Sequence, residues 1–247
     1  MTQIKSVLVS QPQPDNQKSP YLDLASKYNI KIDFRSFIHV QGAELRETKI
    51  SKDDIKKFTA IILTSRNAID HFFRICEEMR YEVPNTLKYF CTSEAIAVYL
   101  QKYVVYRKRK IFFAGQKINE LADILKKHKK ELYLLPSSDI LKPIIPALFQ
   151  EAGIEYTRSI FYKTVSSDLS DLENVFYDLL VFYSPAGIES LFKNFPNFKQ
   201  NKTLIAVFGD TTKAAADKAG INVNIFAPTP ENPSMTGAIE SYIKKNK

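Results

Sequence analysis

The stretch IILTSRNAIDHFF at residues 61–73 has a counterpart in LVFYSPAGIESLF at residues 180–192, and this pair is the strongest indication of the fold. In each stretch a short apolar run ends at a serine, Ser65 or Ser184, and a helical pattern follows. Short apolar runs are typical of buried strands, and a serine before a periodic segment is typical of a helix start. Each stretch therefore predicts a strand followed by a helix, and the pair indicates an internal repeat.

The repeat continues beyond this pair. YFCTSEAIA at 89–97 aligns with VFGDTTKAA at 207–215, which places Ser93 opposite Thr211 at nearly the same offset. A third, looser match follows in each copy. Chance similarity between ordinary strand and helix units is the alternative explanation, and the consistent order of the matches disfavours it.

The fourth match runs in the opposite order along the chain, because LFQEAGIEY at 148–156 resembles LASKYNIKI at 24–32. This circular order is explained if one domain is inserted into the other. We expect an inserted domain, a discontinuous outer domain and a linker of two strands, with predicted limits of 43–159, 1–38 plus 166–247, and 39–42 with 160–165. Paired crossovers of this kind form a hinge with a ligand cleft beside it.

Strand and helix patterns alternate along the whole chain, which predicts parallel sheets covered by helices. The expected strands are 6–9, 31–37, 60–63, 88–91, 104–106, 131–135, 156–162, 179–183, 204–208 and 223–226. The expected helices are 19–28, 67–80, 93–102, 117–127, 140–152, 187–194, 211–219 and 234–245. The predicted fold class is therefore α/β, with two similar open parallel-sheet domains of the flavodoxin-like type.

Composition limits the class of protein. Of 247 residues, 45% are hydrophobic and 25% are charged, which is the range of a folded globular protein. Two cysteines, Cys76 and Cys91, cannot form a disulfide framework, and no apolar run approaches the length of a membrane span. We expect a cytoplasmic protein, a monomer that does not enter a membrane.

The net charge of +8 permits a nucleic acid, an anionic surface or a polyanionic small ligand as partner. The two densest basic runs, 107–110 and 126–130, lie between apolar segments and are predicted to be solvated turns. The chain has no zinc-finger spacing and no aromatic and basic stretch of the kind that binds RNA. We therefore expect no nucleic acid, and a nucleic-acid-binding protein remains a minor alternative.

The loops after the predicted strands are rich in hydroxyl groups and nearly free of charge. They are 64–67, 91–93, 136–138, 183–186, 209–212 and 228–230. In open α/β sheets, ligands lie outside the carboxyl ends of the strands, near these loops and the helix starts that follow them. Each serine or threonine alone is explained as a helix cap. Together, in a basic chain, the loops fit a large ligand with several carboxylates or phosphates.

Familiar catalytic motifs are absent from the sequence. His39, His71 and His128 are scattered, without a cluster of metal-ligand spacing, and we expect no metal. The chain has only seven glycines and no glycine-rich phosphate loop or nucleophile elbow. We therefore expect no cofactor.

Several of these segments together resemble the uroporphyrinogen-III synthase family over essentially the whole chain. The match rests on the linker sequence 160–164 (IFYKT), the loop 182–187 (FYSPAG) and the loop 209–212 (GDTT), with weaker similarity at 34–37, 63–69 and 228–233. The resemblance implies two domains, one inserted in the other across a two-stranded linker.

The resemblance also implies an activity. The family closes hydroxymethylbilane, a linear tetrapyrrole with eight carboxylates, into a macrocycle whose last pyrrole ring is inverted, through a spirocyclic intermediate and with loss of water. This cofactor-independent lyase reaction belongs to tetrapyrrole and haem biosynthesis. Spontaneous closure gives the uninverted isomer, so the enzyme mainly holds the chain on one trajectory.

The same resemblance assigns residues. Tyr162, in the return linker, corresponds to the functional tyrosine of the family and is expected to act as an acid where hydroxide departs. Packing of a strand aromatic across the hinge is the alternative role for Tyr162. Thr211 and Thr212 resemble a carboxylate-binding pair. The remaining expected substrate-binding residues are Thr64, Ser65, Ser93, Ser138, Tyr183, Ser184 and Ala186.

Two positions depart from the family pattern. Many members have Arg-Pro after the first strand, whereas this chain has Ser10-Gln11-Pro12 and so lacks one expected cation. Glu94, at a predicted helix start, repels a carboxylate unless it turns away as a capping residue. A non-catalytic binder or sensor of a polyanionic small molecule remains the alternative function.

Overall fold

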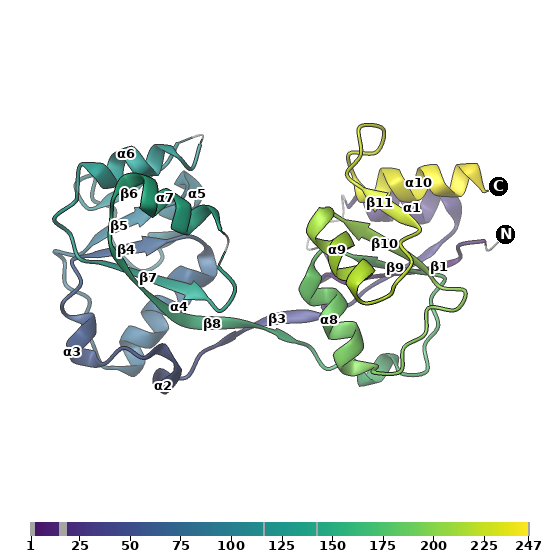
Figure 1. Cartoon of the computed structure of the whole chain (residues 1–247), viewed down its shortest axis with the longest axis horizontal. Coiled ribbons are helices and arrows are strands. Elements are labelled where there is room, and N and C mark those ends of the chain that lie inside the picture. Colours follow the sequence, from purple (N-terminus) through teal and green to yellow (C-terminus); the bar gives the residue numbers. More distant parts are fainter. Residues whose placement is uncertain (1–2, 15–18, 116, 142, 247) are drawn as a thin grey trace. The chain divides into compact units, whose positions relative to one another are not determined.

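The computed structural model describes residues 3–14, 19–115, 117–141 and 143–246. The chain divides into two compact units. Unit 1 comprises Met1–His39 and Val165–Lys247, and unit 2 comprises Val40–Thr164, so that unit 2 interrupts unit 1 in the sequence (Figure 1).

Unit 1 is an open sheet of five strands in the order β11-β10-β9-β1-β2, with all neighbouring strands parallel. Read from β2, this is the strand order of a flavodoxin-like sheet. Its elements are β1 (Ser6–Val9), α1 (Pro20–Tyr28), β2 (Lys31–Phe34), the short 3-10 helix η1 (Ser170–Leu172), β9 (Leu179–Phe182), α8 (Pro185–Asn194), β10 (Leu204–Phe208), α9 (Asp210–Lys218), β11 (Ile225–Ala227) and α10 (Met235–Lys245).

Unit 2 is built around a sheet in the order β3-β8-β7-β4-β5-β6, in which β8, β7, β4, β5 and β6 run parallel. Its elements are β3 (Ile38–Gly42), α2 (Leu45–Thr48), α3 (Lys52–Ile55), β4 (Ala60–Leu63), α4 (Arg66–Glu78), β5 (Lys88–Cys91), α5 (Glu94–Leu100), β6 (Ile111–Phe113), α6 (Glu120–Lys126), β7 (Tyr133–Ser138), α7 (Ile144–Ala152) and β8 (Tyr156–Ser166). The strands β3 and β8 are neighbours and extend across the two points where the chain passes from one unit to the other.

The two sheets match strand by strand in the way that the repeat predicts. In the positions held by β2, β1, β9, β10 and β11 in unit 1, unit 2 has β8, β7, β4, β5 and β6. The fold class expected from the sequence, two similar parallel-sheet domains with one inserted into the other, is confirmed.

Helices cover both faces of each sheet, which is why the central strands β4 and β9 are buried throughout. In unit 2, α4 and α5 contribute to the core on one face and α6 and α7 to the core on the other. In unit 1, α1 and α10 cover one face, and α8 and α9 cover the other.

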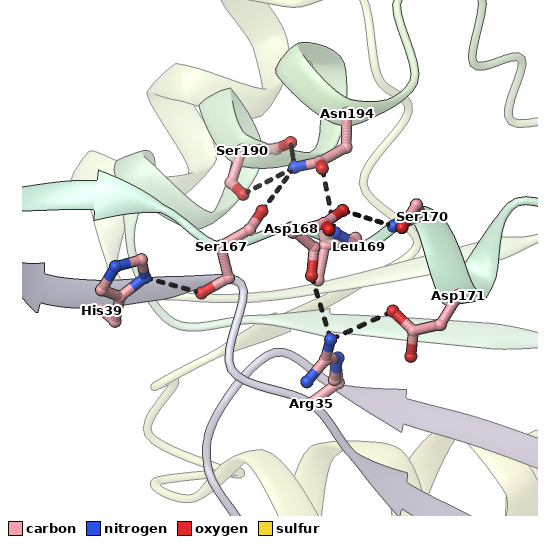
Figure 2. Close-up of polar contacts among 9 residues, drawn as sticks. All are labelled: Arg35, His39, Ser167, Asp168, Leu169, Ser170, Asp171, Ser190 and Asn194. Carbon is pink, nitrogen blue, oxygen red and sulfur yellow. Dashed lines mark hydrogen bonds and ion pairs between the residues drawn. The ribbon is translucent and has the colours of Figure 1, made fainter.

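A polar network holds the unit 1 ends of the two connecting segments against α8 (Figure 2). Asn194 donates to the carbonyl of Ser167 at 2.9 Å and accepts from the amide of Leu169 at 3.0 Å. Ser190 donates to the carbonyl of Phe37, and His39 Nδ1 lies 3.2 Å from Ser167 Oγ. The last turns of α8 therefore fix both the outgoing and the returning segment.

The predicted strand at 104–106 is wrong. Val105 is 80% exposed, and the strand forms instead at β6, where Ile111 is 3% exposed and pairs with Tyr89. The β-branched pair at 104–105 favours a strand locally, but the edge position of the sheet is filled by the more apolar residues that follow the basic turn.

The remaining differences concern element ends and short elements. The strand β2 ends at Phe34, before the end of the expected strand 31–37, while β3 covers the linker strand expected at 39–42. The sequence analysis missed α2, α3 and η1, which are too short to show a helical period. Helices α6 and α7 begin three and four residues later than expected. Lys142, within the expected helix 140–152, lies outside the described residues. No helix in the described part of the chain is long and apolar enough to cross a membrane.

The limits of unit 2 lead to a prediction about autonomous folding. A fragment of residues 40–164 should unfold cooperatively in urea, followed by circular dichroism, because unit 2 has its own core. A fragment of residues 43–159 lacks Phe161, which is fully buried. Loss of this side chain should make the shorter fragment less stable by more than about 3 kcal/mol. Equal stability of the two fragments, or an unfolded 40–164, would contradict the assignment.

Candidate active site

A pocket of about 380 Å³ lies in unit 2 at the carboxyl ends of β7 and β4, where the order of strands along the sheet reverses. This reversal is the position at which open α/β sheets bind ligands. The lining residues are Thr64, Ser65, Thr92, Ile118, Ser137, Ser138, Ile140, Leu141, Ile144, Ile145 and Tyr162. The structure thus brings together four residues expected from the sequence, namely Thr64, Ser65, Ser138 and Tyr162, in one pocket that is also lined by several isoleucine and leucine side chains.

Ser65 connects the start of α4 to the pocket. It precedes the helix with an extended backbone, and its Oγ accepts a hydrogen bond of 3.0 Å from the amide of Ala68. The same Oγ lies 3.1 Å from the phenolic oxygen of Tyr162. Because the amide of Ala68 uses only one acceptor site, the hydroxyl proton of Ser65 is free to bond to Tyr162.

Tyr162 is held on both its ring and its hydroxyl. It lies on β8, is 7% exposed and belongs to the core of unit 2. The ring of His71, on α4, stacks on it with a centroid distance of 5.2 Å and an interplanar angle of 17°. With Ser65 at the hydroxyl, the phenol has a defined orientation at the pocket wall.

The surroundings of His71 favour its neutral form. Burial lowers the pKa of His71 from its ordinary value, and the adjacent Arg74 guanidinium lowers it further. Arg74 Nε lies 3.1 Å from His71 Nδ1, and since a guanidinium can only donate, Nδ1 is the acceptor. The proton of the neutral imidazole is therefore on Nε2.

The carboxyl end of β7 is bonded to a cation that the sequence analysis missed. Arg158, exposed on β8, donates from Nε to Ser137 Oγ at 2.9 Å and from Nη2 to the carbonyls of Ser138 and Asp139 at 2.9 and 2.8 Å. Ser138 Oγ lies 2.7 Å from Asp139 Oδ1. Burial tends to raise the pKa of Asp139, but hydrogen bonds from Ser138 and from backbone amides outweigh it, and the net pKa is lowered. No local pattern around Arg158 marks it, because its partners lie about twenty residues earlier.

Ser93 is the one expected residue of unit 2 that does not line this pocket, and its neighbour Thr92 does. Ser93 precedes α5 but makes no side-chain capping bond. Glu94, in the first turn of α5, is exposed.

In unit 1 the equivalent reversal lies between β1 and β9. Ser184 immediately precedes α8 as its cap, and its Oγ accepts from the amide of Gly187 at 3.2 Å. A methyl group at Gly187 would lie 3.6 Å from Ser184 Oγ and 3.7 Å from Ser10 Oγ. The hydroxyls of Ser10, which follows β1, and of Ser184, which follows β9, therefore both lie beside this glycine. Ala186 is partly exposed in the first turn of α8.

Tyr183 pairs with a residue that the sequence analysis did not single out. Its hydroxyl lies 2.6 Å from that of Tyr21 on α1, and its ring packs against Phe208. Burial raises the pKa of both phenols. A single tyrosine at the start of a helix gives no local sign of such a partner, so only the fold reveals the pair.

Thr211 was expected to begin a helix, and this prediction is wrong. Gly209 occupies the capping position of α9, with φ of 84°, and the helix begins at Asp210. Glycine is suited to this left-handed conformation because it has no Cβ. Thr211 is exposed, whereas Thr212 is 1% exposed. Of the two threonines, only Thr211 has a side chain on the surface.

The described residues hold no group of three His, Cys, Asp or Glu side chains that could bind a metal ion. Cys76 and Cys91 are free and buried, and burial raises the pKa of each thiol to about 12. These thiols are therefore protonated and packed at neutral pH. Among the residues that line the pocket in unit 2, the polar side-chain groups are the hydroxyls of Thr64, Ser65, Thr92, Ser137, Ser138 and Tyr162.

The capping geometry gives a stability prediction. Replacement of Ser65 or of Ser184 by alanine should lower the free energy of unfolding by about 1 kcal/mol each, because each hydroxyl accepts a helix-start amide. Ser93→Ala, the matched control, should change it by less than about 0.5 kcal/mol, since Ser93 makes no such bond. Urea denaturation of the three variants measures this, and an equal loss at Ser93 would contradict the capping assignment.

Comparison with known proteins places the chain in a family. Residues 21–237 match the family model described as uroporphyrinogen-III synthase HemD. The chain is 25% identical over 257 residues to a uroporphyrinogen-III synthase of Chlorobaculum parvum, covering 98% of this chain and 100% of the relative. It is 26% identical over 141 residues to the enzyme of Saccharomyces cerevisiae, covering 51% and 50%.

Solved structures agree on the fold. The uroporphyrinogen-III synthetase structure from Helicobacter pylori aligns over 98% of this chain and 100% of its own, with a TM-score of 0.60 and 17% identity. A mutant uroporphyrinogen III synthase from Thermus thermophilus aligns over the same shares, with a TM-score of 0.52 and 11% identity. Since the family model spans most of the sequence, the chain belongs to the uroporphyrinogen-III synthase family.

Proposed function

We propose that this protein is a uroporphyrinogen-III synthase, which closes hydroxymethylbilane with inversion of the terminal pyrrole ring and loss of water. The observation that carries the proposal is the pocket of unit 2, where the Tyr162 phenol lies beside Thr64, Ser65 and Ser138 in a member of this family. We propose the hydroxyl-bearing starts of α8 and α9 in unit 1 as further groups that bind carboxylates.

The electrostatics of the chain suit a substrate with eight carboxylates. The net charge is +8, and it attracts a polyanion over a distance. Close to the substrate, we propose that Thr64, Ser184 and Thr211, with helix-start amides that no side chain caps, bind the acetate and propionate groups, while Ser65 bonds to Tyr162. Arg158 supplies a cation at the edge of the unit 2 pocket. The hydroxyls and amides are neutral donors, which orient an anion and still let the product leave.

Tyr162 is proposed as the acid that assists loss of hydroxide. A phenol is neutral at physiological pH, so it donates a proton or hydrogen bond without pairing with the carboxylates of the substrate. When Ser65 donates to the phenolic oxygen, the phenolic proton remains free for the leaving group, and negative charge that develops on the oxygen is stabilised. The larger part of the rate enhancement comes from holding the chain in the geometry that closes the inverted ring.

We propose further that the protein acts as a monomer in the cytoplasm, without cofactor or nucleic acid. The buried, unpaired thiols of Cys76 and Cys91 suit a reducing compartment.

Isomer analysis tests the function. Incubation of the protein with hydroxymethylbilane, followed by oxidation and chromatographic separation of the isomers, should give mainly the type III product. Spontaneous closure in buffer alone is the control and gives type I. A protein that only binds the substrate, as a sensor does, would leave the type I product or slow its formation, and that outcome would reject the proposed enzyme.

Tyr162→Phe tests the acid. The ring and its stacking on His71 are kept, so stability should change little, while kcat should fall about ten- to a hundredfold. The product should remain type III, because the loops and not the phenol hold the chain. Tyr156→Phe is the matched control, since Tyr156 lies on the same strand and packs on Phe149 outside the pocket. Wild-type activity in Tyr162→Phe would leave Tyr162 a packing residue, and a change to type I would make it a positioning residue.

A further inference from the structure

Arg74, on α4, binds three different segments of unit 2 with one guanidinium. Its Nη2 donates to the carbonyl of Ala43 at 2.8 Å and to the carbonyl of Phe161 at 3.2 Å. Its Nε donates to His71 Nδ1 at 3.1 Å, and Nη1 pairs with Glu78. The fixed fork of the guanidinium makes these bonds mutually consistent, which a lysine ammonium cannot reproduce.

Gly42 supports this arrangement independently, because the absence of a side chain there leaves space for the Arg74 guanidinium. A methyl group at this position would lie 2.8 Å from Cζ and 2.9 Å from Nη2 of Arg74. These distances are too short for a real Cβ, so any larger residue at position 42 would push the guanidinium out of its place. The backbone at Gly42 is not left-handed, and the reason for a glycine here is therefore space.

The contacts of Arg74 converge on Tyr162 from two sides. Along the chain, the carbonyl of Phe161 accepts two hydrogen bonds, one from Arg74 at 3.2 Å and one from the amide of Ala43 at 3.0 Å. This carbonyl belongs to the peptide group that joins Phe161 to Tyr162. Through space, Arg74 holds His71, whose ring stacks on the phenol. The remaining charged groups near His71 are Asp70 and Glu78.

We propose that Arg74 is a positioning residue for Tyr162, which fixes the phenol by bonding to the backbone before it and by holding His71 as a neutral ring with its proton on Nε2. The inference rests on the proposed function, in which Tyr162 assists departure of the hydroxyl. Gly42 makes room for the arginine, and Ser65 completes the set by binding the phenolic oxygen.

A ligand-free measurement tests the arrangement without any assumption about activity. The chain has three histidines, so a ¹⁵N-histidine spectrum of the full chain is assigned with His39→Gln and His128→Gln variants. In wild type, above neutral pH, His71 should have an unprotonated Nδ1 and a protonated Nε2. In Arg74→Gln, the Nδ1 signal should move toward a mixture of tautomers and the pKa of His71 should rise, because the adjacent cation is gone. An unchanged His71 signal in Arg74→Gln would overturn the proposal.

Kinetics separate positioning from general stability. Arg74→Gln should lower kcat about tenfold with little change in KM, and Arg74→Lys should recover part of the loss, since an ammonium can bind one carbonyl but not all four acceptors. Arg80→Gln, just beyond the end of α4, removes the same charge outside these contacts and should behave as wild type. Gly42→Ala should reproduce the effect of Arg74→Gln while the arginine is retained, and it serves as the test if Arg74→Gln does not fold.

The decisive comparison is a double-mutant cycle between Arg74 and Tyr162. If Arg74 acts through the phenol, Arg74→Gln should lower kcat no further in the Tyr162→Phe background. Multiplicative losses in the double variant would assign Arg74 to structure alone and overturn the inference. Failure of wild type to make the type III isomer, or of Tyr162→Phe to lower kcat, would instead reject the proposed function, and the histidine spectrum would still decide whether Arg74 sets the state of His71.

Discussion

The rest of the structure depends on one constraint, that parallel strands can pair only when a crossover connects them. In both units the crossover after the central strand is a helix that begins at a serine, β4 leading through Ser65 into α4 and β9 leading through Ser184 into α8. The strand is buried on both faces, so its polar end and the helix start are the first points where a ligand can meet the backbone. The reversal of strand order beside each serine leaves an opening there, and in unit 2 that opening is the pocket with Tyr162.

The same two helices also hold the segments that connect the units. On α4, Arg74 bonds to the carbonyls of Ala43 and Phe161. On α8, Ser190 and Asn194 bond to the carbonyls of Phe37 and Ser167. His71 and Ser190 occupy equivalent positions in the repeat, but their contacts differ. Ser190 bonds directly to a connecting carbonyl, whereas in unit 2 the cation Arg74 makes those bonds and His71 stacks on the phenol of Tyr162. In unit 1 the side chains of α8 that hold the connecting segments, Ser190 and Asn194, are neutral.

Tyr162 illustrates how a residue serves the core and a reaction together. Its ring is part of the packed interior, and only its hydroxyl end reaches the pocket beside Ser65. Such burial gives a phenol few rotamers, so the orientation of its O–H is set before a substrate arrives. A reaction that closes spontaneously to the wrong isomer benefits most from this kind of orientation. A site of neutral donors, with Arg158 at its edge, is therefore consistent with the proposed activity.

The sequence alone determined the architecture, because the internal repeat and the hydrophobic periodicity of strands and helices can be recognised directly in the amino-acid sequence. It predicted the parallel sheets, the insertion and the serines at the starts of α4 and α8, and four of its expected residues line one pocket. It did not predict the bonds of Arg158 to the end of β7, the pair of Tyr21 with Tyr183 or the contacts of Arg74, and it placed the start of α9 at Thr211 rather than at Asp210. Only the tertiary structure decided these features, since Ser65 and Tyr162 are 97 residues apart and Arg74 and Phe161 are 87 apart. Contacts of that separation depend on the register of neighbouring strands and on which helix face meets which backbone carbonyl, and no local pattern of residues encodes either.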